Sequence, residues 1–140
     1  MKKRILIVDD DTSVRESLKR VLIESGYEVS MACDGAEGET QLRSQPVDLL
    51  ILDLNMPNRD GWDVLGCTTA ENPLLPVILI TGMFDQLETT MIPGVSVLLK
   101  KPVDVAPLLE SIKTLLTESV EERLGKVHAA QEPTPWMRAS

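Results

Sequence analysis

The chain has 140 residues, of which 43% are hydrophobic but only 3% aromatic, and it carries a net charge of −8. This length and composition predict one domain with an aliphatic core. The acidic balance disfavours a nucleic-acid partner, because binding to phosphate backbones depends on basic surfaces. The two cysteines, Cys33 and Cys67, form no Cys-X-X-Cys motif. They therefore favour a reducing compartment over a disulfide framework or a thiol redox site.

The N-terminus, "MKKRILIVDDD", begins with basic residues as a secretory signal does. The apolar run Ile5–Val8 is too short for the core of a signal peptide, and three acidic residues follow it directly. No apolar run in the chain approaches the length of a membrane span. We therefore expect a cytoplasmic protein that does not contact a membrane.

Short apolar runs alternate with amphipathic segments along the chain. This alternation predicts an α/β fold, a single doubly wound five-stranded parallel sheet with helices on both faces. Several runs lack polar alternation, which indicates strands that are buried on both faces. In such sheets, ligands bind at the carboxyl ends of the strands. The predicted strands are Ile5–Val8, Tyr27–Met31, Val47–Leu52, Pro76–Thr81 and Val95–Leu99.

The first helix is predicted to run from about Ser13 to Gly26, where glycine ends it. Ser13 and Glu16 have capping-box spacing, and Asp11 or Thr12 is an alternative cap. The other predicted helices cover 36–44 and 86–91, a short helix with Trp62, Val64 and Leu65 in a segment that Asn72-Pro73 ends, and a last helix after Asp104. The apolar face of the last helix extends to Leu116, and the helix can run on to about residue 130.

Four of the five predicted strands end on groups that carry charge or a hydroxyl. In chain order these groups are Asp9-Asp10-Asp11, Asp53, Thr81 and Lys100-Lys101-Pro102. In a parallel sheet they meet at one edge. Carboxylates that lie close together repel one another, and a cation or an ammonium group relieves that repulsion. Mg²⁺ suits such a site, since it takes oxygen ligands and needs only one or two carboxylates.

A carboxylate with these neighbours can act as a nucleophile and form an aspartyl phosphate. Phosphoryl transfer needs positioned groups that neutralise charge, and Asp10, Thr81 and Lys101 can supply them around Asp53. Each group also has a structural explanation taken alone. Asp11 can be only a helix cap, a lysine after a strand is usually solvated, and Thr81-Gly82 can be an ordinary turn. The combination at four strand ends favours the phosphoryl site.

The motifs "ILIVDDD", "LLILDLNMPNRDGW", "PVILITG" and "LLKKP" closely resemble the receiver domain of two-component response regulators. The resemblance covers about residues 2–118 in the same order and spacing. It implies a flavodoxin-like sheet with strand order 2-1-3-4-5. It also divides the chain into a receiver domain at 1–118 and a C-terminal helical extension and tail at 119–140.

The resemblance implies a role for each residue at the strand ends. Asp53 matches the phosphoacceptor, Thr81 the switch hydroxyl, and Lys101 the lysine that pairs with the phosphoryl group, whereas Lys100 matches no family residue and is expected to be solvated. Asp10 matches the main acidic Mg²⁺ ligand, to which Asp53 adds its own carboxylate. The other two metal positions are Asn55, through its backbone carbonyl, and Asp9, through water.

The family receives its phosphoryl group from a phosphohistidine on a sensor histidine kinase or phosphotransfer protein, and small phosphodonors can also serve. The resemblance thus implies a switch that accelerates only its own phosphorylation and dephosphorylation, not a turnover enzyme. Leu98 departs from the family pattern, because an aromatic residue usually occupies this switch position, three residues before the lysine. The segment between Thr81 and Gly94 is also short and contains Pro93, which indicates a short or irregular fourth helix.

Apolar spacing continues into the tail at Val120, Leu124 and Val127. Such an extension can pair with a second copy, contact its own domain, lead to an output domain or form a simple linker. A homodimer through the last helix, or through the face of the fourth helix and fifth strand, is one expectation. Direct nucleic-acid binding by this segment is not expected.

Two other functions share part of this pattern. A haloacid-dehalogenase-type phosphohydrolase also uses an aspartate nucleophile at a strand end. Its D-x-D motif differs from Asp53-Leu54-Asn55, however, and its nucleophile precedes the acidic pair. A receiver-like interaction domain that is not phosphorylated is the other alternative, and Leu98 leaves room for it.

Overall fold

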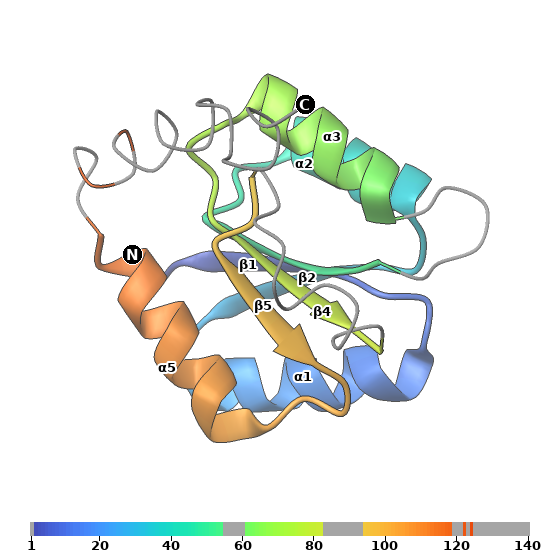
Figure 1. The fold of residues 1–140 in the computed structure, drawn as a ribbon. Helices are drawn as coiled ribbons and strands as arrows, with labels where there is room; N and C mark the ends of the chain where they lie inside the picture. The colour runs from blue at the N-terminus through green and yellow to red at the C-terminus, as the bar shows by residue number, and fades with distance from the viewer. Residues whose placement is uncertain (1, 55–60, 83–93, 119–121, 123, 125–140) are drawn as a thin grey trace, which may run out of the picture.

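The computed structural model describes residues 2–54, 61–82, 94–118, 122 and 124. Strands and helices alternate along these residues as far as the fourth strand (Figure 1). The strands are β1 (Arg4–Val8), β2 (Glu28–Ala32), β3 (Leu49–Asp53), β4 (Val77–Thr81) and β5 (Val97–Lys100). The helices are α1 (Thr12–Glu24), α2 (Gly35–Ser44), α3 (Gly61–Glu71) and α5 (Val105–Leu116).

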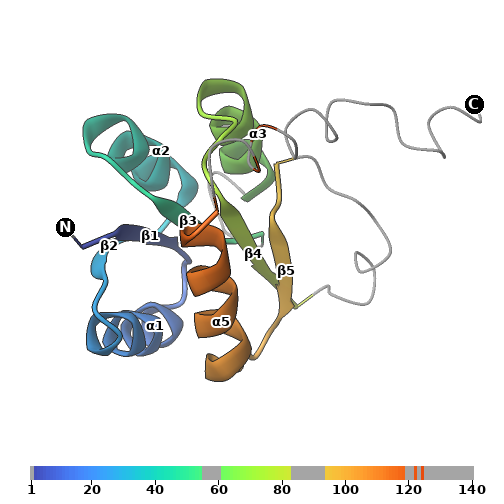
Figure 2. The same cartoon turned by 90° about the vertical axis from the view of Figure 1, so that its left-hand side faces the viewer.

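The strands form one parallel sheet in the order β2-β1-β3-β4-β5, which confirms the predicted doubly wound arrangement. The helices α2 and α3 cover one face, while α1 and α5 cover the other (Figure 2). Because all strands run in the same direction, their carboxyl ends lie along one edge of the sheet.

Side chains alternate between two cores on the two faces of the sheet, as the strand period of two requires. In β3, Leu50 and Leu52 belong to the core under α2 and α3, whereas Leu49 and Ile51 belong to the core above α1 and α5. All four are fully buried. A strand covered on both faces reads as a continuous apolar run, which is why these strands were recognisable in the sequence.

The helix caps correct one prediction. Asp11, not Ser13, is the N-cap of α1, and its carboxylate accepts hydrogen bonds from the N–H groups of Ser13 (2.8 Å) and Val14 (3.2 Å). The capping box at Ser13 and Glu16 was therefore wrong and the alternative cap at Asp11 is confirmed, because Asp11 satisfies the first free N–H groups. The predicted end at Gly26 is confirmed, since this glycine follows the helix with a φ of +96°.

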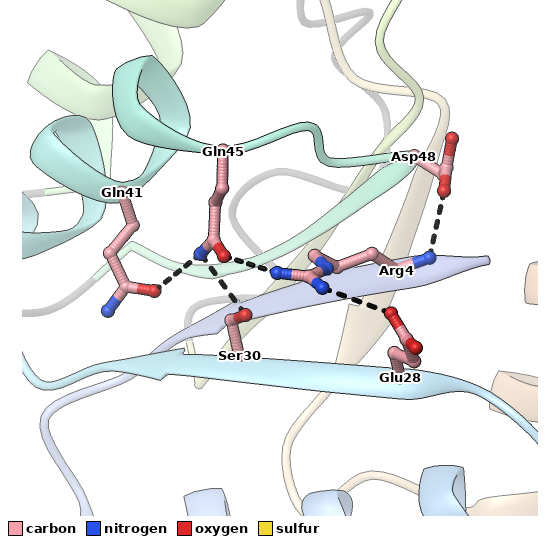
Figure 3. Close-up of polar contacts among 6 residues, drawn as sticks. All are labelled: Arg4, Glu28, Ser30, Gln41, Gln45 and Asp48. Atoms are coloured by element: carbon pink, nitrogen blue, oxygen red, sulfur yellow. Dashed lines mark hydrogen bonds and ion pairs between the residues drawn. The ribbon is translucent and has the colours of Figure 1, made fainter. Parts of the chain in front are cut away.

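A polar network fastens the opposite, amino-terminal edge of the sheet (Figure 3). The Arg4 guanidinium donates to Gln45 Oε1 and to Glu28 (3.0 Å), and the Arg4 N–H donates to Asp48 (2.8 Å). The Gln45 amide in turn donates to Ser30 Oγ (3.1 Å) and to Gln41 Oε1 (2.9 Å). The network ties the end of α2 to β1 and β2 at the edge away from the predicted site.

Some predictions fall outside the described residues. These are the helix at 86–91, the irregular fourth helix, and nearly all of the extension at 119–140, so the domain division at 118 also stays a prediction. The short helix predicted around Trp62, Val64 and Leu65 is α3, which covers Gly61–Glu71 and ends directly before Asn72-Pro73, as predicted. Cys33 and Cys67 form no disulfide. Within the described ranges, no helix is both long and apolar enough to cross a membrane.

Candidate functional site

The register of the sheet brings the predicted residues to neighbouring strand ends. Val8 pairs with Leu52, so Asp9 follows β1 beside Asp53 at the end of β3. On the next strand Asp53 pairs with Ile80, which places Thr81 one position further. Thr81 pairs with Lys100, and Lys101 follows directly. The parallel topology therefore gathers these groups as predicted.

Three carboxylates form a cluster at this edge. One oxygen from each of Asp9, Asp10 and Asp53 lies within 4.8 Å of the other two. The Asp9 and Asp53 side chains are buried, at 0% and 1% exposure, whereas Asp10 is exposed. Three negative charges at this separation repel one another, most strongly where water is excluded. The cluster therefore favours a positive charge among its members.

Lys101 supplies one such charge. Its ammonium lies 3.1 Å from Asp53 Oδ2 and 3.4 Å from Asp9 Oδ2. Burial by itself lowers the pKa of Lys101, but the hydrogen bond to Asp53 and the charges of Asp9 and Asp53 outweigh burial and raise it. The side chain stays charged at neutral pH and is held against both carboxylates. Lys100 is exposed, which confirms that it is the solvated lysine of the pair.

The backbone positions Lys101 and Asp9 within the site. The Lys101 N–H donates to the Thr81 carbonyl (3.0 Å), and the peptide bond between Lys101 and Pro102 is cis. The Asp9 N–H donates to the Ala32 carbonyl (3.2 Å), while Asp9 Oδ1 accepts from the Asp11 N–H (2.9 Å). One Asp9 oxygen thus holds the loop after β1 and the other faces Lys101, which agrees with an indirect role in metal binding.

Gly61 allows α3 to begin directly against the end of β3. Its N–H donates to the Leu54 carbonyl (3.1 Å). A Cβ atom on Gly61 would lie 2.3 Å from the Asp53 carbonyl oxygen and 2.6 Å from Leu54 Cα. Both contacts are with backbone, which cannot move aside as a flexible side chain can. Only glycine fits here without shifting Asp53.

Thr81 and Leu98 lie on the face of the sheet that α2 and α3 cover. Leu79 belongs to the core on this face, and Leu98 pairs with Leu79 and packs against the same core. Thr81 stands two positions after Leu79 and is completely buried. Leucine has no hydrogen-bonding group, so the aromatic-hydroxyl interaction available to an aromatic switch residue is not available to Leu98. The switch roles of Thr81 and Leu98 remain predictions.

The donor set fits Mg²⁺, which prefers oxygen ligands and retains water in its coordination shell. Asp10 and Asp53 offer carboxylate oxygens close together, and the exposure of Asp10 leaves one side open to water. A bound ion would also offset the charge that remains after Lys101 is counted, because the cluster has three carboxylates and Lys101 supplies one positive charge. Asn55 lies outside the described residues, so the role of its carbonyl stays a prediction.

Arg15, which no sequence motif pointed to, lies beside the site. Its Nη1 donates to the Asp9 carbonyl oxygen (2.7 Å), and its Nη2 donates to Thr12 Oγ1 (3.1 Å). A bond from a helical side chain back to a backbone carbonyl six residues earlier follows no motif. From the sequence alone, an arginine in the first turns of a helix is expected to be an ordinary surface residue.

Comparison with known proteins identifies the family. A family profile described as the response regulator receiver domain matches residues 5–113. Response regulator MprA of Mycobacterium bovis is 36% identical over 124 residues, covering 87% of this chain and 54% of the relative. MprA of Mycobacterium ulcerans is 37% identical over 118 residues, covering 83% and 51%. The chain thus spans about half the length of these relatives.

Solved structures agree with the sequence matches. A CheY-like receiver domain protein from Methanospirillum hungatei superposes with a TM-score of 0.77 at 31% identity, covering 90% of this chain and 99% of that one. TrrA from Thermotoga maritima, solved in complex with Mg²⁺ and BeF, gives 0.75 at 34% identity, covering 81% and 98%. Sequence and fold together show that the chain belongs to the response regulator receiver domains, the phosphoacceptor domains of two-component systems.

Proposed function

We propose that Asp53 is the phosphoacceptor of this receiver and that it takes a phosphoryl group in an Mg²⁺-dependent step. One observation carries the proposal. The buried carboxylate of Asp53 lies 3.1 Å from the Lys101 ammonium and within 4.8 Å of oxygens of Asp9 and Asp10. This arrangement supplies a carboxylate that can act as nucleophile, a cation and two further oxygen ligands, which are the groups that an aspartyl-phosphate reaction uses.

In the proposed reaction a carboxylate oxygen of Asp53 attacks the phosphorus of the donor. The new O–P bond makes an acyl phosphate, the P–N bond of the donor phosphohistidine breaks, and its electron pair leaves with the imidazole nitrogen. The Lys101 ammonium, already beside Asp53, pairs with a phosphoryl oxygen. Bound Mg²⁺ supplies further neutralisation of the phosphoryl charge, and Asp10, Asp53, the Asn55 carbonyl and, through water, Asp9 would hold it.

We also propose a switch and not a turnover enzyme, because the chain belongs to the receiver domains. In this proposal the chain accelerates only its own phosphorylation and dephosphorylation. Thr81, buried one position beyond the strand partner of Asp53, is the proposed switch hydroxyl. With Leu98 on the same face, we propose that Thr81 acts here without an aromatic partner.

The proposed donor is a sensor histidine kinase or a phosphotransfer protein, because this is the chemistry that receiver domains use. The chain matches only about half the length of its curated relatives. A homodimer through α5 or through the region of β5 is one proposed readout. Direct nucleic-acid binding by this acidic segment is not proposed.

Family membership weighs against a haloacid-dehalogenase-type phosphohydrolase. The receiver-like domain that is never phosphorylated is the alternative to be tested, and Leu98 is the feature that favours it. Under that alternative the acidic cluster would be retained without being used.

The test is incubation of the full chain with acetyl phosphate and MgCl₂, followed by intact-mass measurement. We expect one phosphoryl adduct on the wild type, none without Mg²⁺, and none on Asp53→Asn. Asp48→Asn is the matched control, because Asp48 directly precedes the amino end of β3 and the same substitution there leaves the site untouched. Failure of the wild type to form an adduct, or an equal adduct on Asp53→Asn, would overturn the assignment.

A further inference from the structure

Arg15 contacts the backbone that carries the metal-binding carboxylates. Its guanidinium forks between the Asp9 carbonyl oxygen (2.7 Å) and Thr12 Oγ1 (3.1 Å). The side chain is half-buried and comes from the second turn of α1. The bond to Asp9 spans the whole loop between β1 and α1, so it fixes the loop against the helix that follows it.

The loop between β1 and α1 has few other interactions that fix the position of Asp10. The Asp9 side chain is buried and bonded to the Asp11 N–H, but the Asp10 side chain is exposed. Among the residues that the structure describes, none forms a hydrogen bond or an ion pair with the Asp10 carboxylate. Its position therefore depends on its own backbone. The Asp9 carbonyl and the Asp10 nitrogen belong to one planar peptide group, so a bond to that carbonyl also orients Asp10.

We propose that Arg15 is a positioning residue for the Mg²⁺ site, acting through the peptide bond between Asp9 and Asp10. The inference rests on the proposed function, since it assumes that Asp10 and Asp53 hold Mg²⁺. Arg15 contacts neither the ion nor the phosphoryl group. It holds Asp10 in place before the ion binds, so that binding does not have to order the loop. Residues that orient metal ligands in this way commonly contribute tenfold or more to metal affinity.

The charge of Arg15 and its positioning of Asp10 have opposite effects on Mg²⁺ affinity, so a variant of Arg15 can distinguish them. A guanidinium close to a cation site repels the ion, so loss of the charge alone would strengthen Mg²⁺ binding. Loss of positioning would weaken it. Arginine also differs from lysine, since only the planar fork can reach two acceptors at fixed angles. The lysine variant therefore keeps the charge but only part of the positioning.

The experiment is a titration of the ¹⁵N-labelled full chain with MgCl₂, followed through the amide signals of Asp11 and Gly61. We expect Arg15→Ala to bind Mg²⁺ about tenfold more weakly than the wild type. Arg15→Lys should lie between them, and Thr12→Ala should show a smaller loss in the same direction. Arg20→Ala is the matched control, because Arg20 lies on the same helix, carries the same charge and is exposed. The same spectra report whether each variant is folded.

The outcomes separate the two proposals. If the wild type does not bind Mg²⁺, the metal site of the proposed function fails. If the wild type binds but Arg15→Ala binds as tightly or more tightly, only the role of Arg15 is overturned. If Arg15→Ala does not fold, Arg15→Lys and Thr12→Ala test the role of Arg15 instead. A Mg²⁺ affinity equal to that of the wild type in both variants would refute the positioning role. Equal weakening in Arg20→Ala would also refute it.

Discussion

The Lys101 ammonium lies 3.1 Å from Asp53 Oδ2 and 3.4 Å from Asp9 Oδ2, so one positive charge lies against two carboxylates that are almost completely shielded from water. Replacing Lys101 with methionine leaves both carboxylates without this cation. We expect the free energy of unfolding, measured with urea at neutral pH without Mg²⁺, to fall by about 1–2 kcal/mol, since the lysine side chain is partly open to solvent. Phosphorylation by acetyl phosphate should also slow at least about tenfold.

Lys100→Met is the control for this change, because the neighbouring lysine is exposed. It should leave both the unfolding midpoint and the phosphorylation rate close to those of the wild type. Equal behaviour of the two variants would show that Lys101 does not stabilise the acidic cluster.

The same contact predicts how stability depends on pH. The pKa of Lys101 is raised above the ordinary lysine value of 10.5 by its two carboxylate neighbours, although burial opposes this. A group that binds its proton more tightly when folded stabilises the fold below its unfolded pKa, and this contribution is lost as pH rises through the folded pKa. The wild type should therefore lose stability above pH 10.5 more steeply than Lys101→Met, as measured by urea unfolding. Parallel curves would contradict the raised pKa.

The junction between β3 and α3 should be sensitive to a single methyl group. In Gly61→Ala the new Cβ meets the Asp53 carbonyl oxygen and Leu54 Cα, so the strand end that carries Asp53 must shift. We expect a loss of about 1–3 kcal/mol in unfolding free energy and slower phosphorylation.

Gly66→Ala is the matched control in the same helix. A Cβ atom at Gly66 meets no heavy atom within 4 Å. Since alanine favours helix over glycine, this variant should gain up to about 1 kcal/mol and phosphorylate normally. A Gly61→Ala variant that behaves like Gly66→Ala would refute the close approach.

The sheet and most of the site were predictable because they depend on local patterns. Strands buried on both faces appear as apolar runs, and a parallel sheet brings Asp9, Asp53 and Lys101 to one edge whatever the loops do. At that edge the Lys101 ammonium lies 3.1 Å from Asp53 and 3.4 Å from Asp9.

Other features depend on competition or on contacts between distant atoms. Ser13 and Asp11 both have capping chemistry, so the sequence left both as candidates, and the structure places the cap at Asp11. Arg15 reaches a backbone carbonyl, which is present at every residue and therefore leaves no trace in the sequence. The helix α3 is longer than the short helix predicted, although it ends before Asn72-Pro73 as predicted. Gly66 and two threonines lower its helix propensity, while the burial of Val64 and Leu65 stabilises it.

The polar network at the opposite edge should affect stability without affecting phosphorylation. Gln45→Ala removes the side-chain amide that hydrogen-bonds to Arg4, Ser30 and Gln41. Each of these half-buried polar groups then loses one hydrogen bond. We expect unfolding free energy to fall by about 1–2 kcal/mol, with an unchanged phosphorylation rate. Arg43→Ala, which breaks an exposed ion pair with Glu71, should change neither. A slower phosphorylation in Gln45→Ala would show that the two edges are coupled.

The most direct test of the central claim is to locate the phosphoryl group in the wild type. After reaction with acetyl phosphate and MgCl₂, borohydride reduces an aspartyl phosphate to homoserine, and peptide mass spectrometry identifies the converted residue. We predict conversion at Asp53 alone, with Asp9, Asp10 and Asp48 unchanged. Conversion at another carboxylate, or none at Asp53 in a protein that binds Mg²⁺, would contradict the assignment of Asp53 as the phosphoacceptor.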